Sequence, residues 1–193
     1  MPKKRESTFW NMLMTLFLVT LIAGTSVGYV YELTREPKAR ADLEKKISAI
    51  RNVTPDFDNN PIKDAYPVEL NGVTLTFFPV KNNGKHVATA VSTFSSEGYG
   101  GDIHLMVGFL PNGQIYDTAV IEHKETPGLG NKIETVKSDF SRQFEQKDPA
   151  AFDLSVKQDG GDVDGITAAT ISSRAYCDAV QRAYQAYRKD QDL

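Results

Sequence analysis

VELNGVTLTFFPV, residues 68–80, places a tight turn between two runs of apolar and β-branched side chains. Asn71-Gly72 supplies the two residues with positive φ that a type I′ hairpin turn requires. The flanking runs, residues 68–70 and 73–80, therefore predict two antiparallel strands. A hairpin of this kind needs further strands or a helix to bury its apolar face.

Strand signals continue along the chain after this hairpin. Asn-Asn-Gly at 82–84 and Pro-Asn-Gly at 111–113 are turn sequences. Apolar and β-branched runs that border these turns predict further antiparallel strands. These strands are expected at residues 86–94, 103–110 and 115–122.

Two helices are expected after the strands. The first spans residues 131–144, with an apolar face made by Ile133, Val136, Phe140 and Phe144. The second spans residues 171–190, with an apolar stripe made by Tyr176, Val180, Ala183, Tyr184 and Tyr187. Such a stripe is typical of a helix packed on a sheet. The expected fold class is therefore α+β, an antiparallel sheet flanked by helices.

A long apolar span precedes this domain. Residues 9–31 contain no charged side chain, and a helix of this length, at ~1.5 Å per residue, covers a hydrocarbon core of about 30 Å. Basic residues at positions 3–5 predict that the N-terminus is cytoplasmic and that the main domain lies on the periplasmic or extracellular face of the inner membrane. A cleaved signal peptide is the alternative. The apolar run is longer than a usual signal-peptide core, which favours a retained anchor.

The chain is therefore expected to divide into four parts. Pro37 is expected to bend the start of a charged stalk helix that follows the anchor. Pro55, Pro61 and the asparagines between them mark an irregular linker. The four parts are a cytoplasmic tail (1–8), a transmembrane helix (9–31), a stalk helix and linker (32–65) and an extracytoplasmic domain (66–193).

Composition excludes several classes of function. The formal net charge is −3, and no basic cluster follows the first few residues, which argues against a nucleic-acid partner. The single cysteine, Cys177, can form neither an internal disulfide nor a thiolate metal or iron–sulfur site. The three histidines have no ligand spacing, so no metal site is expected.

Three glycine-bearing segments stand between the expected elements. They are SSEGYGGD at 95–102, HKETPGLGNK at 123–132 and DGGDVDGITAATISS at 159–173. Glycine permits positive φ and a close approach between the backbone and a ligand. The third segment leads into the last helix, where free N–H groups and the positive end of the helix dipole suit a phosphate. One of the hydroxyls is expected to cap the helix, but spacing does not choose among Thr167, Thr170, Ser172 and Ser173.

Taken together and in this order behind one span, the three segments resemble the FMN-binding domain family. The family includes the G-type subunit of the Rnf ion-translocating electron transport complex and the C-type subunit of the sodium-translocating NADH:quinone reductase. Its members receive FMN from FAD, through a flavin transferase, on the last hydroxyl of a Dxx[ST]GA[ST] motif. The motif matches Asp164, Thr167, Ala168, Ala169 and Thr170, which implies covalent FMN as a phosphoryl ester on Thr170. Ala168 replaces the usual glycine, and its methyl group is tolerated if φ is negative there.

The resemblance also implies which residues contact the flavin. GYGG at 98–101 and ETPGLG at 125–130 match the family's other two signatures. No residue is expected to be catalytic, because the flavin itself performs the redox chemistry. Asp164 is expected to serve recognition or the turn. Besides Thr170, the implied cofactor-binding residues are Thr167, Asp164, Ala169, Tyr99, Gly100, Glu125, Thr126, Gly128, Leu129 and Gly130.

The implied function is electron transfer within a membrane complex. The short linker after the anchor favours the G-type subunit, whose complex couples ferredoxin:NAD⁺ electron flow to Na⁺ or H⁺ translocation. Its partners would be the other membrane and redox subunits, with a flavin transferase for maturation. No independent catalytic activity is expected. The alternatives are the C-type subunit, a free-standing membrane-anchored flavin carrier and, from a different class, a pilin-like or receptor-type surface protein.

Overall fold

The computed structural model describes residues 8–191. The basic residues at positions 3–5, from which a cytoplasmic N-terminus is predicted, lie outside this described part. Helix α1 (Phe9–Asn52) runs without interruption through Pro37 and across the predicted boundary between anchor and stalk. Within residues 8–191 it is the one helix long and apolar enough to cross a membrane. A proline removes one backbone hydrogen bond, and the helix continues past it.

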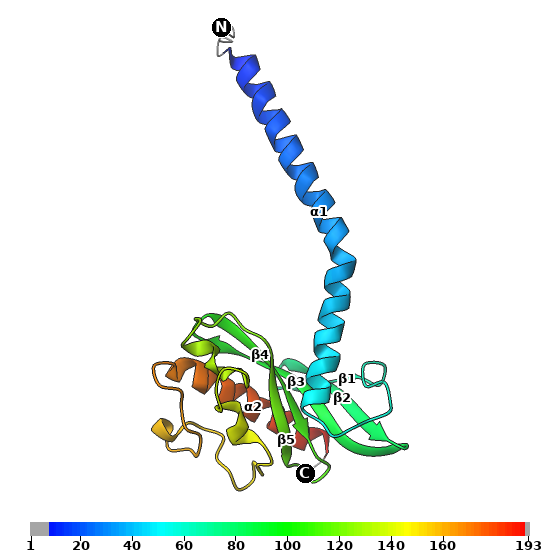
Figure 1. Ribbon diagram of the computed structural model, residues 1–193, viewed down its shortest axis with the longest axis vertical. Helices are drawn as coiled ribbons and strands as arrows, with labels where there is room; N and C mark the ends of the chain where they lie inside the picture. The colour runs from blue at the N-terminus through cyan, green and yellow to red at the C-terminus, as the bar shows by residue number, and fades with distance from the viewer. Residues whose placement is uncertain (1–7, 192–193) are drawn as a thin grey trace. The chain divides into compact units, whose positions relative to one another are not determined.

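Five antiparallel strands form a single sheet in chain order, β1-β2-β3-β4-β5 (Figure 1). Positive φ at Asn71 and Gly72, and again at Asn83 and Gly84, confirms both predicted Asn-Gly turns. The predicted strands and the α+β class are therefore confirmed. The strands are β1 (Tyr66–Leu70), β2 (Val73–Asn82), β3 (Lys85–Gly98), β4 (Gly101–Phe109) and β5 (Ile115–Glu122).

Helix α2 (Thr170–Asp190) covers one face of this sheet (Figure 1). The predicted apolar stripe is confirmed, because Tyr176, Val180, Ala183 and Tyr187 are fully buried and Tyr184 is partly buried. Each buried tyrosine also keeps a hydrogen bond for its hydroxyl. The Tyr176 hydroxyl donates to Thr118 Oγ1 at 2.8 Å. The Tyr187 hydroxyl donates to the Leu110 carbonyl at 3.0 Å, so both halves of the helix are anchored to the sheet.

The opposite face of the sheet carries a second, smaller core. The last turns of α1 and the residue that follows belong to it, through Ala49, Ile50 and Val53. Gly108 on β4 lets this segment approach closely, because a Cβ atom at that position would overlap the Val53 carbonyl. The sheet thus lies between two apolar layers. The strand residues of the second core are Phe78, Val80, Ala88, Ala90 and Met106.

The predicted helix over residues 131–144 is wrong. The structure has two short 3₁₀ turns, η1 (Gly130–Ile133) and η2 (Ser141–Phe144), with non-helical backbone between them. The Ser138 hydroxyl donates to the Lys132 carbonyl at 2.6 Å and accepts the Phe140 N–H at 3.1 Å. Serine competes with helical backbone bonds in this way. Val136, which the helical pattern expects to be buried, is 84% exposed.

Gly108→Ala should destabilise the protein by at least about 2 kcal/mol, because the new methyl group has no room beside the Val53 carbonyl. Chemical denaturation of the purified protein measures the loss. Gly165→Ala is the matched control, since its Cβ atom would meet nothing closer than 3.9 Å. Equal stability of the two variants would contradict the close approach.

Cys177 should resist alkylation in the folded protein. Its side chain is buried, and burial raises the pKa of the thiol to about 12, so the reactive thiolate is scarce at pH 8. Iodoacetamide labelling followed by mass spectrometry should give little product in buffer and full modification in guanidinium chloride. Rapid labelling of the native protein would show that this part of the core is open.

Candidate functional site

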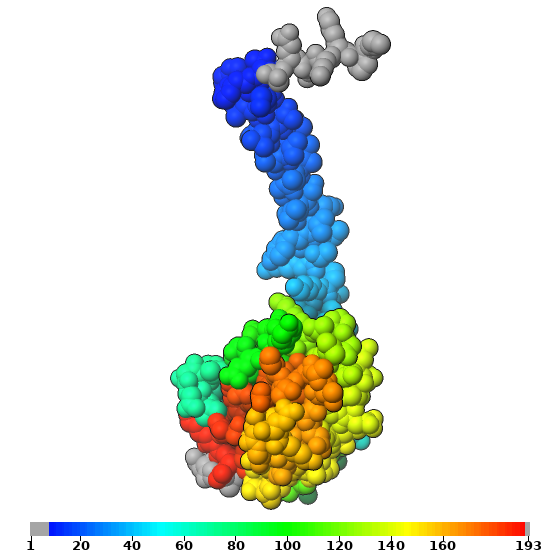
Figure 2. Space-filling model, turned by 90° about the vertical axis from the view of Figure 1, so that its left-hand side faces the viewer, coloured from blue at the N-terminus to red at the C-terminus, as the bar shows by residue number. Residues whose placement is uncertain are grey.

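The three glycine-bearing segments meet at one pocket of about 520 Å³. Pockets that hold small organic ligands commonly have volumes of roughly 300–1,000 Å³. Figure 2 shows yellow-green residues of the second segment beside the orange residues that lead into α2. The pocket is lined by Tyr99, Glu125, Thr126, Leu129, Gly130, Ala168, Ala169, Thr170, Ile171 and Ser172.

The first segment forms the turn between β3 and β4. Gly98 pairs with Gly101, so Tyr99 and Gly100 lie at the tip of the hairpin. Tyr99 is 71% exposed and extends the wall of the pocket towards solvent. Gly100 directs its backbone N–H to the second segment, where it donates to Glu125 Oε1 at 2.9 Å. The hairpin tip is therefore tied to the residues after β5.

The second segment is held by hydrogen bonds around Glu125 and His123. The Glu125 backbone N–H donates to His123 Nδ1 at 3.0 Å. Because Nδ1 accepts this bond, the ring proton of a neutral His123 resides on Nε2, which lies 3.0 Å from Glu134 Oε1. His123 thus shapes the loop. It does not line the pocket.

Three glycines in these segments are required by close packing. A Cβ atom at Gly100 would overlap the Lys124 carbonyl, and a Cβ atom at Gly98 would lie 2.8 Å from Glu125 Oε1. One at Gly130 would overlap Glu125 Oε2 and lie 2.7 Å from Ser172 Oγ. These glycines therefore allow the segments to close around the Glu125 side chain.

The start of α2 lacks the predicted hydroxyl cap. The residue before its first turn is Ala169, with no side-chain capping bond. Ser173 instead uses its hydroxyl to accept the Ile166 N–H at 2.9 Å and to donate to the Ala169 carbonyl at 3.0 Å. Among the described residues, none accepts a hydrogen bond from the backbone N–H groups of residues 170–172. The helix start therefore keeps the features that attract an anion.

The structure distinguishes among the four hydroxyls at the start of α2 that residue spacing does not tell apart. Ser172 and Ser173 are 1% and 0% exposed, and both hydroxyls are hydrogen-bonded. Thr167 is exposed and does not line the pocket. Thr170 does line the pocket, and within residues 8–191 its hydroxyl has no hydrogen-bonding partner. Thr170 alone of the four combines access to the pocket with an uncommitted hydroxyl.

Comparison with known proteins identifies the family. The family model described as FMN-binding domain matches residues 98–185. The G subunit of the ion-translocating oxidoreductase complex from Stutzerimonas stutzeri is 34% identical over 178 residues, covering 89% of this chain and 78% of that protein. The chain belongs to the FMN-binding domain family.

Two further members carry the same name, the G subunit of an ion-translocating oxidoreductase complex. The protein from Erwinia tasmaniensis is 39% identical over 148 residues, covering 72% of this chain and 70% of its own length. The protein from Pasteurella multocida is 36% identical over 195 residues, covering 95% of this chain and 94% of its own length. The similarity to these G-type subunits therefore extends well beyond the FMN-binding domain itself.

The pocket brings together seven of the residues that the family signatures point to. Gly100, Gly128, Thr167 and Asp164 do not line it. Asp164 instead pairs with Lys157 Nζ at 2.8 Å, as a residue of the turn. The seven residues are Tyr99, Glu125, Thr126, Leu129, Gly130, Ala169 and Thr170.

The cofactor contacts implied by the family signatures leave out three pocket residues, Ala168, Ile171 and Ser172. Ala168 lies in the motif and Ser172 is one of the four hydroxyls at the helix start, but neither is assigned as a contact. In the family motif Ala168 replaces a glycine, so the motif raises a question only about the backbone φ of this residue. Ile171 and Ser172 directly follow Thr170 in the first turn of α2. A signal was available, because successive residues of a helix's first turn surround any ligand that binds to its N–H groups.

The condition under which alanine is readily tolerated in place of glycine, a negative φ at Ala168, is not met. The residue has φ +63°, in the left-handed region where glycine is favoured. The usual glycine of the FMN-binding domain family thus fits the backbone that this chain adopts. A non-glycine residue there costs about 1–2 kcal/mol in strain. The Ala169 N–H closes the turn around this residue by donating to the Ile166 carbonyl at 3.0 Å.

Ala168→Gly should therefore stabilise the protein, by about 0.5–1 kcal/mol after the greater flexibility of glycine in the unfolded chain is subtracted. Thermal or chemical denaturation measures the change. The control is Ala175→Gly, inside α2, where the helical backbone already has negative φ and glycine relieves no strain. That variant should lose about 0.5–1 kcal/mol. A loss of stability in both variants would contradict the strain at residue 168.

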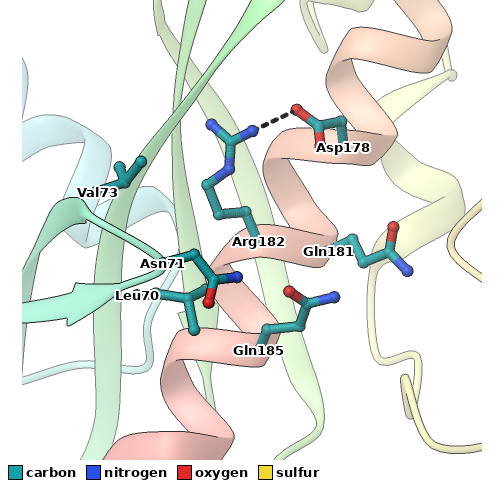
Figure 3. Close-up of a pocket in the computed structure, with 7 residues that line it drawn as sticks. All are labelled: Leu70, Asn71, Val73, Asp178, Gln181, Arg182 and Gln185. Carbon is teal, nitrogen blue, oxygen red and sulfur yellow. Dashed lines mark hydrogen bonds and ion pairs between the residues drawn. The ribbon is translucent and has the colours of Figure 1, made fainter.

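A second hollow, of about 340 Å³, lies where the β1–β2 hairpin meets α2 (Figure 3). None of the three glycine-bearing segments lines it. Its one cationic side chain, Arg182, is already committed, since it pairs with Asp178 at 3.0 Å and donates to the Phe94 carbonyl at 2.6 Å. Among the described residues, this hollow therefore offers no free positive charge to a ligand. Its lining residues are Leu70, Asn71, Val73, Asp178, Gln181, Arg182 and Gln185.

Proposed function

We propose that this protein carries FMN as a phosphoryl ester on Thr170 and transfers electrons as the G-type subunit of an ion-translocating oxidoreductase complex. The observation that carries the proposal is the uncommitted Thr170 hydroxyl, which lies in the pocket at the first residue of α2. Membership of the FMN-binding domain family supplies the identity of the cofactor.

The pocket has the chemistry that FMN requires. The free N–H groups at residues 170–172 and the positive end of the α2 dipole suit a phosphodiester next to Thr170. Tyr99, Leu129 and Ile171 expose large apolar surfaces on the pocket wall, where a flavin ring could be held. FMN supplies the redox chemistry when bound. The protein's own residues orient it and leave it accessible to partners at the surface.

Attachment requires a separate enzyme. The Thr170 Oγ1–phosphorus bond forms while the pyrophosphate bond of FAD breaks, AMP leaves, and the hydroxyl proton passes to a base. Within residues 8–191 no carboxylate or imidazole is hydrogen-bonded to the Thr170 hydroxyl. Both oxygens of the nearby Glu125 are already engaged. A base supplied by a flavin transferase is consistent with this arrangement.

The membrane context supports a role outside the cytoplasm. We place the apolar part of α1 in the inner membrane, with the basic residues 3–5 on the cytoplasmic side and the FMN-binding domain on the outer face. A covalent bond keeps the flavin with its carrier where free FMN would be lost by dilution. The complex would couple ferredoxin:NAD⁺ electron flow to Na⁺ or H⁺ translocation, together with its other membrane and redox subunits.

The comparisons favour this proposal over the alternatives. The relatives are named as G subunits of an ion-translocating complex, which favours the G-type over the C-type subunit and over a free-standing carrier. A pilin-like or receptor-type protein would leave the FMN-binding domain without a role. Purification in mild detergent, followed by identification of the bound subunits, distinguishes a complex from a free carrier.

Thr170→Ala should abolish flavin attachment. Wild-type protein co-expressed with a flavin transferase should gain the mass of one FMN less one water, on the peptide that contains Thr170. Mass spectrometry and in-gel flavin fluorescence both detect this. Thr170→Ser should restore attachment, and Thr167→Ala should retain it because that hydroxyl lies outside the pocket. Wild-type protein without flavin, or flavin that persists in Thr170→Ala, would refute the proposal.

A further inference from the structure

Glu125 is a buried acid without a cationic partner. Its side chain lines the pocket, yet the residue is only 5% exposed. Oε1 accepts the Gly100 N–H at 2.9 Å, and Oε2 accepts the Ser172 hydroxyl at 2.5 Å. In the described part of the chain, no lysine, arginine or histidine forms an ion pair with this carboxylate. A buried carboxylate is normally paired with a cation, so this arrangement calls for an explanation.

The helix start offers part of the explanation. Ser172 is the third residue of α2, so its bond to Oε2 holds the carboxylate near the positive end of the helix dipole. Two hydrogen-bond donors and the dipole then replace a cationic side chain. These donors are neutral groups. The carboxylate in the pocket wall is therefore hydrogen-bonded, but its negative charge is not cancelled by a positive one.

Two hydrogen bonds and close packing hold the carboxylate in place. The backbone of Gly98 and Gly130 lies so close to its two oxygens that a Cβ atom at either position would crowd them. The group is therefore fixed before any ligand arrives, which is the condition under which a protein charge acts most strongly on a bound cofactor. It also joins the three segments, since Gly100, Glu125 and Ser172 each belong to a different one.

We infer that Glu125 is a positioning residue that joins the three segments of the pocket and holds a fixed negative charge that lowers the reduction potential of the flavin. This inference rests on the proposed function, because it requires FMN in the pocket at Thr170. Reduction adds negative charge to a flavin. A carboxylate fixed nearby, in surroundings of low dielectric constant, disfavours that addition.

The test is Glu125→Gln in the full-length protein, co-expressed with a flavin transferase and purified in detergent. Glutamine keeps the shape and removes the charge. Its amide oxygen can accept the Gly100 N–H, while its NH2 group donates to the Ser172 hydroxyl instead of accepting from it. The midpoint potential of the flavin, measured by spectroelectrochemical titration, should shift to a more positive value. Glu134→Gln is the matched control. Its carboxylate belongs to the same loop but lies outside the pocket, so its shift should be clearly smaller.

Ser172→Ala provides a second test, in which the midpoint potential of the flavin should shift in the opposite direction. It retains the carboxylate but removes one donor that offsets its charge, so the midpoint potential should shift to a more negative value. An unchanged potential in flavin-loaded Glu125→Gln, or a shift in the same direction in both variants, overturns the inference. If Glu125→Gln folds without taking up flavin, Ser172→Ala decides by itself. A negative shift then supports the inference, and no shift or a positive one overturns it.

The joining role is measured without flavin. In protein produced without the transferase, Glu125→Ala leaves the Gly100 N–H and the Ser172 hydroxyl without their acceptor, and Tm should fall by about 5–10 °C. Glu125→Gln should lose much less. Equal Tm for wild type and Glu125→Ala overturns the joining role. Absence of flavin from wild-type protein made with the transferase would instead show that the proposed function has failed.

Discussion

The packing of α2 against the sheet determines where the pocket forms. Seven apolar residues of the helix are fully buried, and two tyrosine hydroxyls tie it to the sheet and the residue after β4. A helix of 21 residues is about 30 Å long, and its regular geometry relates the place of each residue to that of all the others. The position of Thr170 is therefore set by contacts made along the whole helix. The loops around the pocket then close on a helix start that is already in place.

The glycines of the three segments have two different structural roles. Gly98, Gly100 and Gly130 allow one backbone or side chain to approach another. Gly101 and Gly128 instead adopt positive φ, which permits the sharp turns beside Tyr99 and Leu129. The pocket is therefore built from contacts between loops, and its fixed backbone N–H groups come from the start of α2. The acid among its described lining residues is held by two neutral donors, which distinguishes it from a site built on ion pairs.

Much of the fold could be predicted because its signals are local. Each Asn-Gly pair specifies its own turn, and the stripe on α2 repeats at helical spacing. The same spacing misled at residues 131–144, where the Ser138 hydroxyl captures two backbone groups that a helix would need. The strength of such a competing bond cannot be deduced from apolar periodicity.

The candidate site was predictable in its segments but not in its details. The choice among four hydroxyls depends on burial, and Ser172 is buried by a contact with Glu125, which is 47 residues distant in the chain. The left-handed backbone at Ala168 likewise arises from the turn that the folded domain imposes, because alanine by itself prefers negative φ. Contacts between residues far apart in the chain decide which hydroxyl is accessible, and residue spacing in the sequence does not predict such contacts.

The order of the elements along the chain has a consequence for biosynthesis. Each strand pairs with its immediate predecessor, so the sheet can assemble progressively as the polypeptide lengthens. Helix α2 follows all five strands along the described chain, and without it one face of the sheet stays uncovered and the Thr170 pocket lacks a wall. A ribosome must therefore synthesise the chain through α2 before the pocket exists. Any modifying enzyme that recognises the folded pocket acts only once α2 has been made, and a truncated product that lacks α2 would escape it.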